Sequence, residues 1–355
     1  MSMNFPESFK NSLVESFKQA SCTESSMSHD LDAQFSGVRT VHVMSLRTEP
    51  LQDYNRSVDP SQGSRYGAVK EVQDEVQTFE MAQDKSFTLS IDKGNNKEQL
   101  NMKQVGAVMK AQKEDVIIPW LDKYRLERWA AKAGIHMDLG AALTKTNIVE
   151  KVINAHNEMA DNGAPVDGCT LYIARKYLPY LKLSPEWTNL DSLGGKVLPS
   201  GSVGDLDGMA VKPIPTSRMP ENVAFMIVHK AAVFAPIKVQ DMKGHVDPPG
   251  LSGDLLEFRL ITDAFVLGKK AAGVLAGCEQ GKVCAVPTFG NSSGNITITA
   301  GTSGATIYYT LDGSDPRYSR SVKTYTSAIT LKGGEKLRAY NGKTGLFDSA
   351  VADYN

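Results

Sequence analysis

His156 is the residue whose type comes nearest to catalytic chemistry, because an imidazole can act as a general base near neutral pH. It lies four residues after Val152 and three before Met159, so all three fall on the apolar face of one expected helix. Cys169 begins an apolar strand and has no histidine or cationic neighbour in sequence that would favour its thiolate. We therefore expect a core histidine and a structural thiol, and we assign no catalytic residue.

A glycine-rich segment, GSVGDLDG at residues 201–208, has the outline of a phosphate or calcium loop. It lacks the Lys-Ser/Thr pair of a P-loop, and it lacks the third ligand and the terminal Glu of an EF-hand. We interpret it as a turn between two strands. We expect free thiols, no cofactor site and no metal site, because the cysteines have no common metal-binding spacing. They are Cys22, Cys169, Cys278 and Cys284.

The composition excludes several classes of protein. With 355 residues the chain is long enough for two or three domains. Its 39 basic and 40 acidic side chains give a formal net charge of -1, without the cationic surplus of proteins that grip nucleic-acid phosphates. No apolar stretch reaches about 18 residues, and the first residues lack the order of a signal peptide. We expect a reducing compartment and no membrane partner.

The first residues predict a short amphipathic helix on a tether. Phe9, Leu13 and Phe17 recur every four positions and form a narrow apolar stripe that must pack on another surface. Residues 21–28 are rich in Ser and Thr, so we expect a flexible tether. The helix could then dock on its own subunit or on a neighbouring one, and the sequence leaves both options open.

Residues 40–92 are expected to be mostly extended. VHVM at residues 41–44 opens this region, and SFTLSID at residues 86–92 alternates apolar and polar side chains like a half-buried strand. Between them, residues 53–80 hold few large apolar side chains. A two-stranded flap of this length cannot bury a core alone, so it needs a second surface to lie on.

The middle of the chain mixes helices and strands, which predicts an α+β fold. A helical pattern runs from residue 101 to about 134, and Pro119 predicts a kink near Ile118. A second helix is predicted at residues 147–159. Apolar positions near one side of the first helix are Val105, Val108, Met109, Val116, Trp120, Tyr124 and Trp129. Strands are predicted at residues 169–174, 209–211, 224–228 and 258–261.

Residues 284–355 predict a separate all-β module. Short β-prone runs at residues 296–299, 305–310, 328–331 and 336–340 are separated by Gly, Ser, Asp and Asn turns. Asp312 and Gly313 form a strong turn signal, and Pro316 cannot continue a central strand. This spacing indicates a small antiparallel sandwich.

Taken in order, residues 1 to about 283 resemble a major capsid protein of a tailed bacteriophage, of the Hong Kong 97 type. The segments that carry the resemblance are LQDYNR (51–56), KSFTLSID (85–92), VIIPWLDKYRL (116–126), GDLDGMAV (204–211), PIPTSRM (213–219) and ITDAFVL (261–267). The resemblance implies an N-terminal arm (1–39), an extended β-hairpin loop (40–100), the spine helix of the peripheral domain (101–140), an axial-type α/β domain (141–235) and returning strands of the peripheral domain (236–283).

The tail resembles a different family, the C-terminal β-sandwich of chitobiase and related proteins. GATIYYTLDGSDP at residues 304–316 and KLRAY at residues 336–340 carry this resemblance. It implies an immunoglobulin-like accessory domain at residues 284–355 that has no catalytic residues of its own. On a capsid protein, such a module would project outward as a decoration.

The two resemblances together imply a structural protein and no enzyme. Many copies would form hexamers and pentamers of an icosahedral shell around double-stranded DNA, assembled in the cytoplasm of a bacterial host and carried in the virion. Implied partners are further copies of the chain, scaffolding, portal and decoration proteins, DNA by non-specific contact, and host-surface glycans at the C-terminal domain. Two alternatives stay open: a glycan-binding or cell-surface adhesion protein, and an enzyme with an accessory domain.

Overall fold

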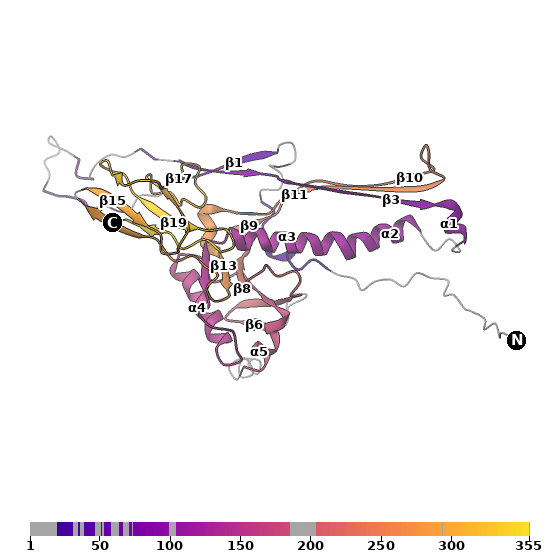
Figure 1. Cartoon of the computed structure of the whole chain (residues 1–355), viewed down its shortest axis with the longest axis horizontal. Coiled ribbons are helices and arrows are strands. Elements are labelled where there is room, and N and C mark those ends of the chain that lie inside the picture. Colours follow the sequence, from indigo (N-terminus) through magenta and orange to yellow (C-terminus); the bar gives the residue numbers. More distant parts are fainter. Residues whose placement is uncertain are drawn as a thin grey trace. The chain divides into compact units, whose positions relative to one another are not determined.

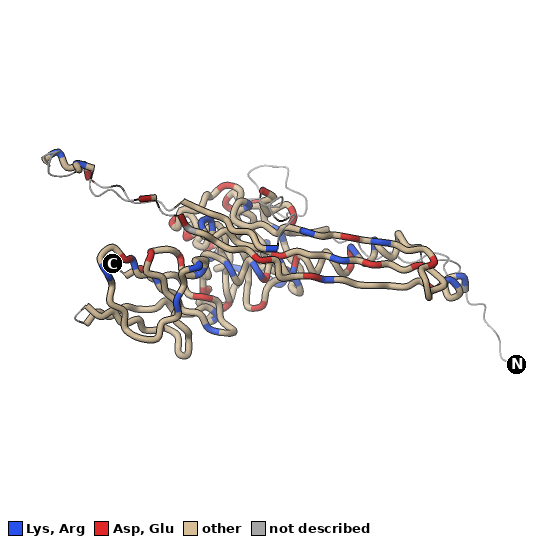
Figure 2. Tube along the Cα trace, turned by 90° about the horizontal axis from the view of Figure 1, so that it is seen from above, with Lys and Arg blue, Asp and Glu red and all other residues tan. Residues whose placement is uncertain are grey.

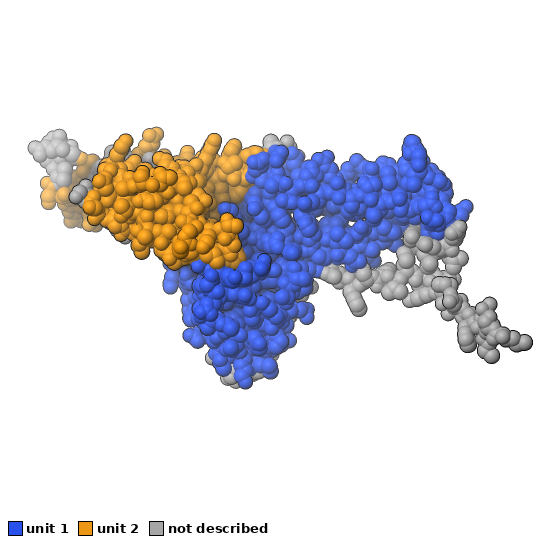
Figure 3. Space-filling view, in the orientation of Figure 1, with its two compact units in different colours: residues 1–39, 80–283 blue, residues 40–79, 284–355 orange. Residues whose placement is uncertain are grey.

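The computed structural model describes residues 20–30, 35, 39–46, 51, 53–57, 64–66, 71–72, 74–98, 104–184, 204–292 and 294–354. The chain divides into two compact units, coloured separately in Figure 3. The first comprises residues 1–39 and 80–283, and the second comprises residues 40–79 and 284–355. No helix within the described ranges is both long enough and apolar enough to cross a bilayer.

The largest described sheet belongs to the first unit, and its central strands are buried almost throughout. Its strands lie in the spatial order β4 (Ile135–Asp138), β13 (Val274–Cys278), β8 (Val223–His229), β5 (Cys169–Ala174), β7 (Met209–Ile214) and β6 (Gly204–Leu206). The pairs β13–β4 and β5–β7 are parallel, and the other pairs are antiparallel. The strands predicted at residues 169–174, 209–211 and 224–228 are therefore confirmed.

Helix α4 (Ile148–Asp161) packs on this sheet because its apolar side chains recur at helical spacing. Gly163 has a φ of 81°, a conformation that residues with a Cβ rarely adopt, and this allows the chain to leave the helix here. The N–H of Ala164 then bonds the carbonyl of Met159 at 3.0 Å. The helix predicted at residues 147–159 is confirmed. Its buried apolar side chains are Ile148, Val149, Val152, Ala155 and Met159.

Helix α2 (Val105–Gln112), a π-helical turn η3 (Lys113–Ile117) and helix α3 (Ile118–Ala131) follow one another directly and form a spine helix (Figure 1). Pro119 has no N–H to donate, which disfavours regular α-helical bonding at this point. The N–H of Ile118 instead reaches the carbonyl of Lys113, one residue beyond the α-helical acceptor. The predicted kink near Ile118 is therefore a π turn directly before the proline.

The π turn also changes which side chains face the core. One extra residue in a turn rotates all later side chains by about 100° around the helix axis. Val116 is consequently 52% exposed, whereas Ile117 is buried at 6%. The prediction that Val116 belongs to the apolar stripe is wrong, while the prediction for Trp129, which has no exposed surface, is confirmed. Trp187 lies outside the described residues.

Three long antiparallel strands form the arm sheet, which lies along the spine helix (Figure 1). They are β10 (Ile237–Val246), β11 (Gly253–Thr262) and β3 (Gln83–Asp92). The register places Phe258 opposite Phe87, with ring centroids 5.1 Å apart. Phe258 and Leu260 form a core cluster with Ile117 of the spine helix, against which Trp120 packs. The strands predicted at residues 86–92 and 258–261 are confirmed.

Charges of both signs run along the strands of the arm sheet (Figure 2), and by strand alternation the ion pairs fall on the face opposite Phe258 and Leu260. Arg259 donates two hydrogen bonds to the carboxylate of Asp84, at 2.7 and 3.1 Å. At the far end of the sheet, Lys93 donates to Asp247 at 2.6 Å. These ion pairs join strand β3 and the residue after it to the hairpin made by β10 and β11.

Residues 21–23 are held by a buried carboxylate on the spine helix. Asp122 has no exposed side-chain surface. It accepts hydrogen bonds from the hydroxyls of Ser21 and Thr23, each at 2.7 Å, and from the backbone N–H of Cys22 at 3.1 Å. Arg218, in the segment between β7 and β8, donates to the same carboxylate at 3.1 Å. Two segments far apart in sequence therefore meet at one charge.

The next residues are anchored as well. Arg125 donates to Glu24 at 2.7 Å, and the ammonium of Lys212 donates to the hydroxyl of Ser26 at 3.0 Å. Met27 is buried at 1% exposure. The prediction of a flexible tether at residues 21–28 is wrong, because the Ser and Thr hydroxyls bond to buried charged groups instead of water. The predicted stripe of Phe9, Leu13 and Phe17 lies outside the described residues.

In the second unit, residues 284–355 form two facing antiparallel sheets, as the sequence predicts for a sandwich. One contains β14 (Thr288–Ser292), β15 (Asn295–Thr299) and β18 (Ile329–Thr330), and the other contains β17 (Lys323–Thr324), β16 (Thr306–Thr310), β19 (Arg338–Gly342) and β20 (Ala352–Asp353). Ile296, Ile298, Ile307 and Leu337 pack between them. The N–H of Cys284 bonds the carbonyl of Phe347 at 2.9 Å, which ties the first residue to the module.

The remaining described elements are short. The second unit also holds a separate two-stranded sheet of β1 (Thr40–Leu46) and β2 (Asp74–Glu80). In the first unit, β9 (Val233–Phe234) pairs with β12 (Phe265–Val266). The other short elements are η1 (Glu24–Ser26), α1 (Lys93–Glu98), η4 (Arg175–Tyr177), α5 (Leu178–Lys182), η6 (Lys230–Ala232) and η7 (Gly268–Gly273).

We predict that Asp122→Asn lowers the free energy of unfolding of the unassembled protein by about 3–5 kcal/mol, because it removes the buried charge to which Arg218 and residues 21–23 donate. Urea unfolding measures the change. Glu127→Gln is the matched control on the same helix, since Glu127 lies 3.8 Å from Lys123 at an exposed i,i+4 pair. That control should cost no more than about 0.5 kcal/mol. Equal costs for the two variants would contradict the anchoring role of Asp122.

The arm sheet should also respond to acid. Hydrogen bonds from Arg259 and Lys93 hold the pKa of Asp84 and of Asp247 below the ordinary value. A carboxylate with a lowered pKa stabilises the fold above its unfolded pKa, and this stabilisation disappears as pH falls through the folded pKa. Between about pH 5 and about pH 2 the wild type should therefore lose more thermal stability than Asp84→Asn/Asp247→Asn. An equal loss in both proteins would show that these two ion pairs do not contribute to thermal stability.

Candidate assembly surfaces

Strands β1 and β2 belong to an extended loop, and several large apolar side chains among its described residues are exposed. The six that are most exposed, which we call the loop surface, are Met44 (71%), Leu46 (66%), Leu51 (102%), Tyr54 (47%), Tyr66 (81%) and Val72 (68%). Covering one such side chain completely is worth about 1.5–3 kcal/mol. The flap predicted from the sequence therefore keeps apolar surface whose burial by a partner would give a large favourable free energy.

Alternation along β1 decides which of its side chains are exposed. Val41 is buried at 8%, whereas Thr40, Met44 and Leu46 lie on the opposite, exposed face of the strand. The hydroxyl of Thr78 and the Nδ1 atom of the His42 ring, 2.9 Å apart, join β1 to β2 on this face. The exposed face is thus an ordered strand surface with apolar side chains.

Farther along the loop, two tyrosines are in contact. The ring centroids of Tyr54 and Tyr66 lie 4.9 Å apart in an edge-to-face arrangement. The N–H of Asn55 bonds the carbonyl of Arg65 at 3.0 Å, which brings the two sides of the loop together. Both rings remain substantially exposed, so this contact leaves apolar surface for another partner.

The arm sheet offers a second surface. Within the described residues, the outer edges of β3 and β10 pair with no further strand. Charged side chains near a free edge discourage unspecific strand pairing. Lys243 lies 2.7 Å from Asp241, and His245 lies 3.3 Å from Glu257, on the charged face of β10 and β11. The arm sheet therefore suits a partner with matching charges more than indiscriminate aggregation.

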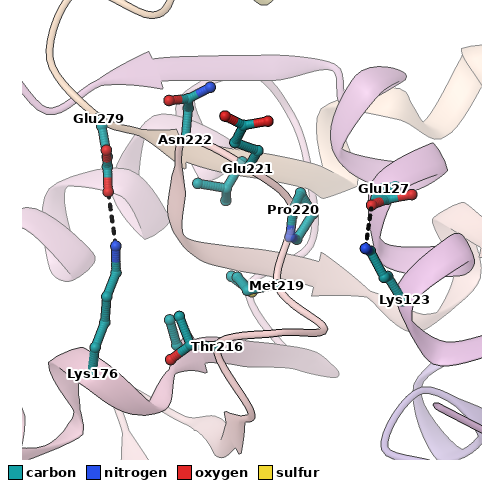
Figure 4. A pocket seen from close by; sticks show the side chains of 11 residues that line it. Lys123, Glu127, Lys176, Thr216, Met219, Pro220, Glu221, Asn222 and Glu279 are labelled. Atoms are coloured by element: carbon teal, nitrogen blue, oxygen red, sulfur yellow. Dashed lines mark hydrogen bonds and ion pairs between the residues drawn. The ribbon is translucent and has the colours of Figure 1, made fainter. Parts of the chain in front are cut away.

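A hollow of about 420 Å³ lies in the first unit beside the spine helix (Figure 4). Lys176 donates to Glu279 at 3.0 Å, and Lys123 lies 3.8 Å from Glu127. The hydrogen bond from Lys176 holds the pKa of Glu279 below its ordinary value. The lining, all of it described, holds no histidine, cysteine or serine.

His156 is buried, as the sequence predicts for a core histidine. It is 2% exposed, and its Nδ1 atom lies 2.7 Å from the carboxylate of Asp207, with Nε2 at 3.3 Å from the carbonyl of Val166. Asp207 reaches it from the turn between β6 and β7, where Asp207 and Gly208 both have positive φ. In the described part of the segment at residues 201–208, strand β6 (Gly204–Leu206) is followed by the predicted turn between strands, at Asp207 and Gly208. The sequence did not indicate that Asp207 would meet His156.

The four cysteines are free, as predicted. Burial raises the pKa of the Cys22 and Cys278 thiols to about 12 and that of Cys169 to about 11. Burial raises the pKa of Cys284 as well. A thiol with a raised pKa stays protonated near neutral pH and is a poor nucleophile. Among the described residues, no group of three His, Cys, Asp or Glu side chains is placed to hold a metal ion.

Sequence reasoning missed the buried charges around Asp122. Its position in the segment VIIPWLDKYRL gave one signal, because a carboxylate beside an apolar stripe needs donors when it is buried. The donors themselves come from residues about a hundred positions away on either side. No local pattern could identify them.

Solved structures from bacteriophages share the fold of this chain. One from Mycobacterium phage Che8 has a TM-score of 0.57 at 13% identity, covering 77% of this chain and 96% of its own. The capsid structure of the cyanophage P-SCSP1u has a TM-score of 0.60 at 12% identity, covering 78% and 93%. The mature capsid of bacteriophage PhiM1 has a TM-score of 0.54 at 11% identity, covering 78% and 93%.

Comparison of sequences adds a finding for the C-terminal module. The family model described as Fn3 associated matches residues 296–353. No curated protein matches the chain in sequence. The likeness upstream of the module is therefore one of fold. We conclude that more than three quarters of the chain adopts the Hong Kong 97-type fold of tailed-phage capsids, and that it is joined to an Fn3-associated module of immunoglobulin-like build.

Proposed function

We propose that the chain is the major capsid protein of a tailed bacteriophage. Many copies assemble into hexamers and pentamers of an icosahedral shell that encloses double-stranded DNA. The observation that carries this proposal is the loop surface, a set of large apolar side chains that are exposed, on a protein with a capsid fold. The protein would act in the virion after assembly in the host cytoplasm, and it would have no enzymatic role.

Copies of the same chain are the partners that best fit the loop surface. Each subunit presents its extended loop once and can cover the loop of a neighbour once, so the contact repeats around a ring. Each contact can be weak, because a subunit held by several neighbours at once dissociates rarely. Charges on the arm sheet, such as Asp84 and Arg259, would fix the register of these contacts more than they would raise the affinity.

The near-neutral charge of the chain suits a container. A formal net charge of -1 gives little general attraction to phosphates, so the enclosed DNA would be held by confinement and non-specific contact.

Scaffolding, portal and decoration proteins are further partners that we propose for such a shell. The C-terminal module, residues 284–355, would project outward from it. We propose for the capsid part the divisions that its resemblance to capsid proteins implies, with the spine helix at residues 101–140 between the extended loop and the axial-type domain.

The rival proposal is a glycan-binding or cell-surface adhesion protein. It is supported by the C-terminal module, which the Fn3 associated model matches only at residues 296–353. It offers no reason for the exposed loop surface or for the long arm sheet. A shell protein whose outer module binds host-surface glycans accounts for both parts of the chain.

We predict that the wild-type protein forms particles tens of nanometres across, and that Met44→Asp/Leu46→Asp stays unassembled. The two side chains are exposed in the single subunit, so the variant should keep its thermal unfolding temperature. Losing their burial at each contact removes about 3–6 kcal/mol, which is far more than a tenfold change in association. Electron microscopy and sedimentation measure the particles.

Thr40→Asp is the control for that experiment. Thr40 is exposed on the same face of β1, so the variant adds a charge without removing apolar surface. It should assemble much better than the double variant. Wild-type protein that remains monomeric in every condition tested, including expression with its neighbouring genes, would refute the proposed function.

We also predict that deleting residues 284–355 leaves assembly intact. The deletion starts at Cys284 because the N–H of this residue already bonds the carbonyl of Phe347 inside the module. Particles of the shortened chain should have the wild-type geometry in electron micrographs and lack protrusions on their outer surface. Loss of all particles, with the shortened chain still folded by circular dichroism, would mean that the module is part of the lattice.

A further inference from the structure

A shallow groove on the C-terminal module has a chemistry that shell assembly does not use. Its volume, about 470 Å³, lies within the range of about 300–1,000 Å³ that small-molecule sites occupy. It opens on the face of β16 and β19 opposite the core residues Ile307 and Ala339. The lining consists of Gly304, Thr306, Tyr308, Tyr340, Gly342, Lys343, Thr344 and Asp348.

Two tyrosines stack against each other in this groove, and we call this pair the platform. Tyr308 and Tyr340 lie opposite each other on β16 and β19, with ring centroids 5.2 Å apart and planes inclined by 23°. A Cβ at Gly342 would lie only 3.3 Å from Cε2 of Tyr308 and 3.0 Å from Oδ1 of Asp348. The missing side chain therefore lets the Tyr308 ring lie across the strand. Both rings are half-buried, and they line the groove.

Polar groups of both kinds surround the platform. The ammonium of Lys343 donates one hydrogen bond to the carbonyl of Ser303 at 2.8 Å, and an ammonium carries three donors in all. Thr306 and Thr344 are exposed, and the carboxylate of Asp348 lies beside Gly342. Burial and the nearby Asp348 raise the pKa of Tyr340, so its phenol stays neutral and able to donate. The groove thus offers an aromatic surface with donors and acceptors at its rim.

We propose that this groove binds a carbohydrate, with one sugar ring packed against the exposed surface of the stacked Tyr308–Tyr340 pair and its hydroxyls bonded to Lys343, Asp348 and Thr306. A pyranose has an apolar C–H face that suits an aromatic platform and a rim of hydroxyls that need donors and acceptors together. A proline-rich peptide could also pack on the tyrosines. It would, however, desolvate the ammonium and carboxylate without replacing their hydrogen bonds.

The inference deepens the proposed glycan partner of the module, and its role on a virion rests on the outward position proposed above. Binding itself does not depend on that position. Full-length protein, both unassembled and as particles, is mixed separately with maltohexaose, cellohexaose and chitohexaose. Saturation-transfer-difference NMR then reports which sugar protons contact the protein. We expect at least one of the three oligosaccharides to bind at millimolar concentration.

Three variants assign any binding to the groove. Tyr308→Ala/Tyr340→Ala should weaken binding at least tenfold, whereas Tyr308→Phe/Tyr340→Phe should keep most of it because the rings remain. Phe289→Ala/Tyr354→Ala is the control, since it removes another aromatic pair of the module, with centroids 5.6 Å apart, outside the groove. Its binding should match the wild type. Circular dichroism checks that each variant is folded.

Several outcomes would overturn the inference: no signal from any of the three sugars, equal binding by the double alanine variant, or binding of a decaproline peptide in place of the sugars. Binding by unassembled protein that is absent in particles would support the groove and contradict the outward position of the module. Binding without any particle formation would support the groove and contradict the capsid function. The two proposals can therefore fail separately.

Discussion

A carboxylate with no exposed surface must find its hydrogen bonds inside the protein, and Asp122 is the group on which the arrangement of the first unit depends. It accepts bonds from residues 21–23 and from Arg218, so the spine helix, the N-terminal segment and the segment between β7 and β8 are joined at one charge. Removing any donor would leave part of that charge unsatisfied in a low-dielectric site. Because of this cost, residues 21–28 favour a single arrangement, in which residues 21–23 bond the Asp122 carboxylate.

The same molecule combines such tightly satisfied interior groups with surfaces that are left open. The six-stranded sheet and α4 bury a continuous core, whereas the side chains of the loop surface around Met44 and Leu46 are exposed. The arm sheet lies between these extremes, because one face packs on the spine helix and the other holds ion pairs in water. Under the proposed function, such a subunit would gain free energy when copies cover the exposed side chains.

Local sequence patterns were sufficient wherever the partner of a residue lies nearby or its face is set by periodicity. The α4 stripe, the apolar run of β5 and strand β16 are of this kind, and these elements form where the sequence predicts them. The pattern failed at Val116, because a π turn shifts the helical phase by one residue. It failed again at residues 21–28, because a Ser/Thr-rich segment reads as solvated unless its buried partners are known.

By itself, the sequence determined the α+β class, the separate C-terminal β-module and the presence of a flap that cannot cover its own apolar residues. Those properties follow from composition and spacing, which act over a few residues. Only the tertiary structure decided that Asp122 meets Ser21 and Arg218, that His156 meets Asp207, and that Tyr308 lies across Gly342. Such contacts join positions from about thirty to about a hundred apart, and their pairing is set by how whole elements pack.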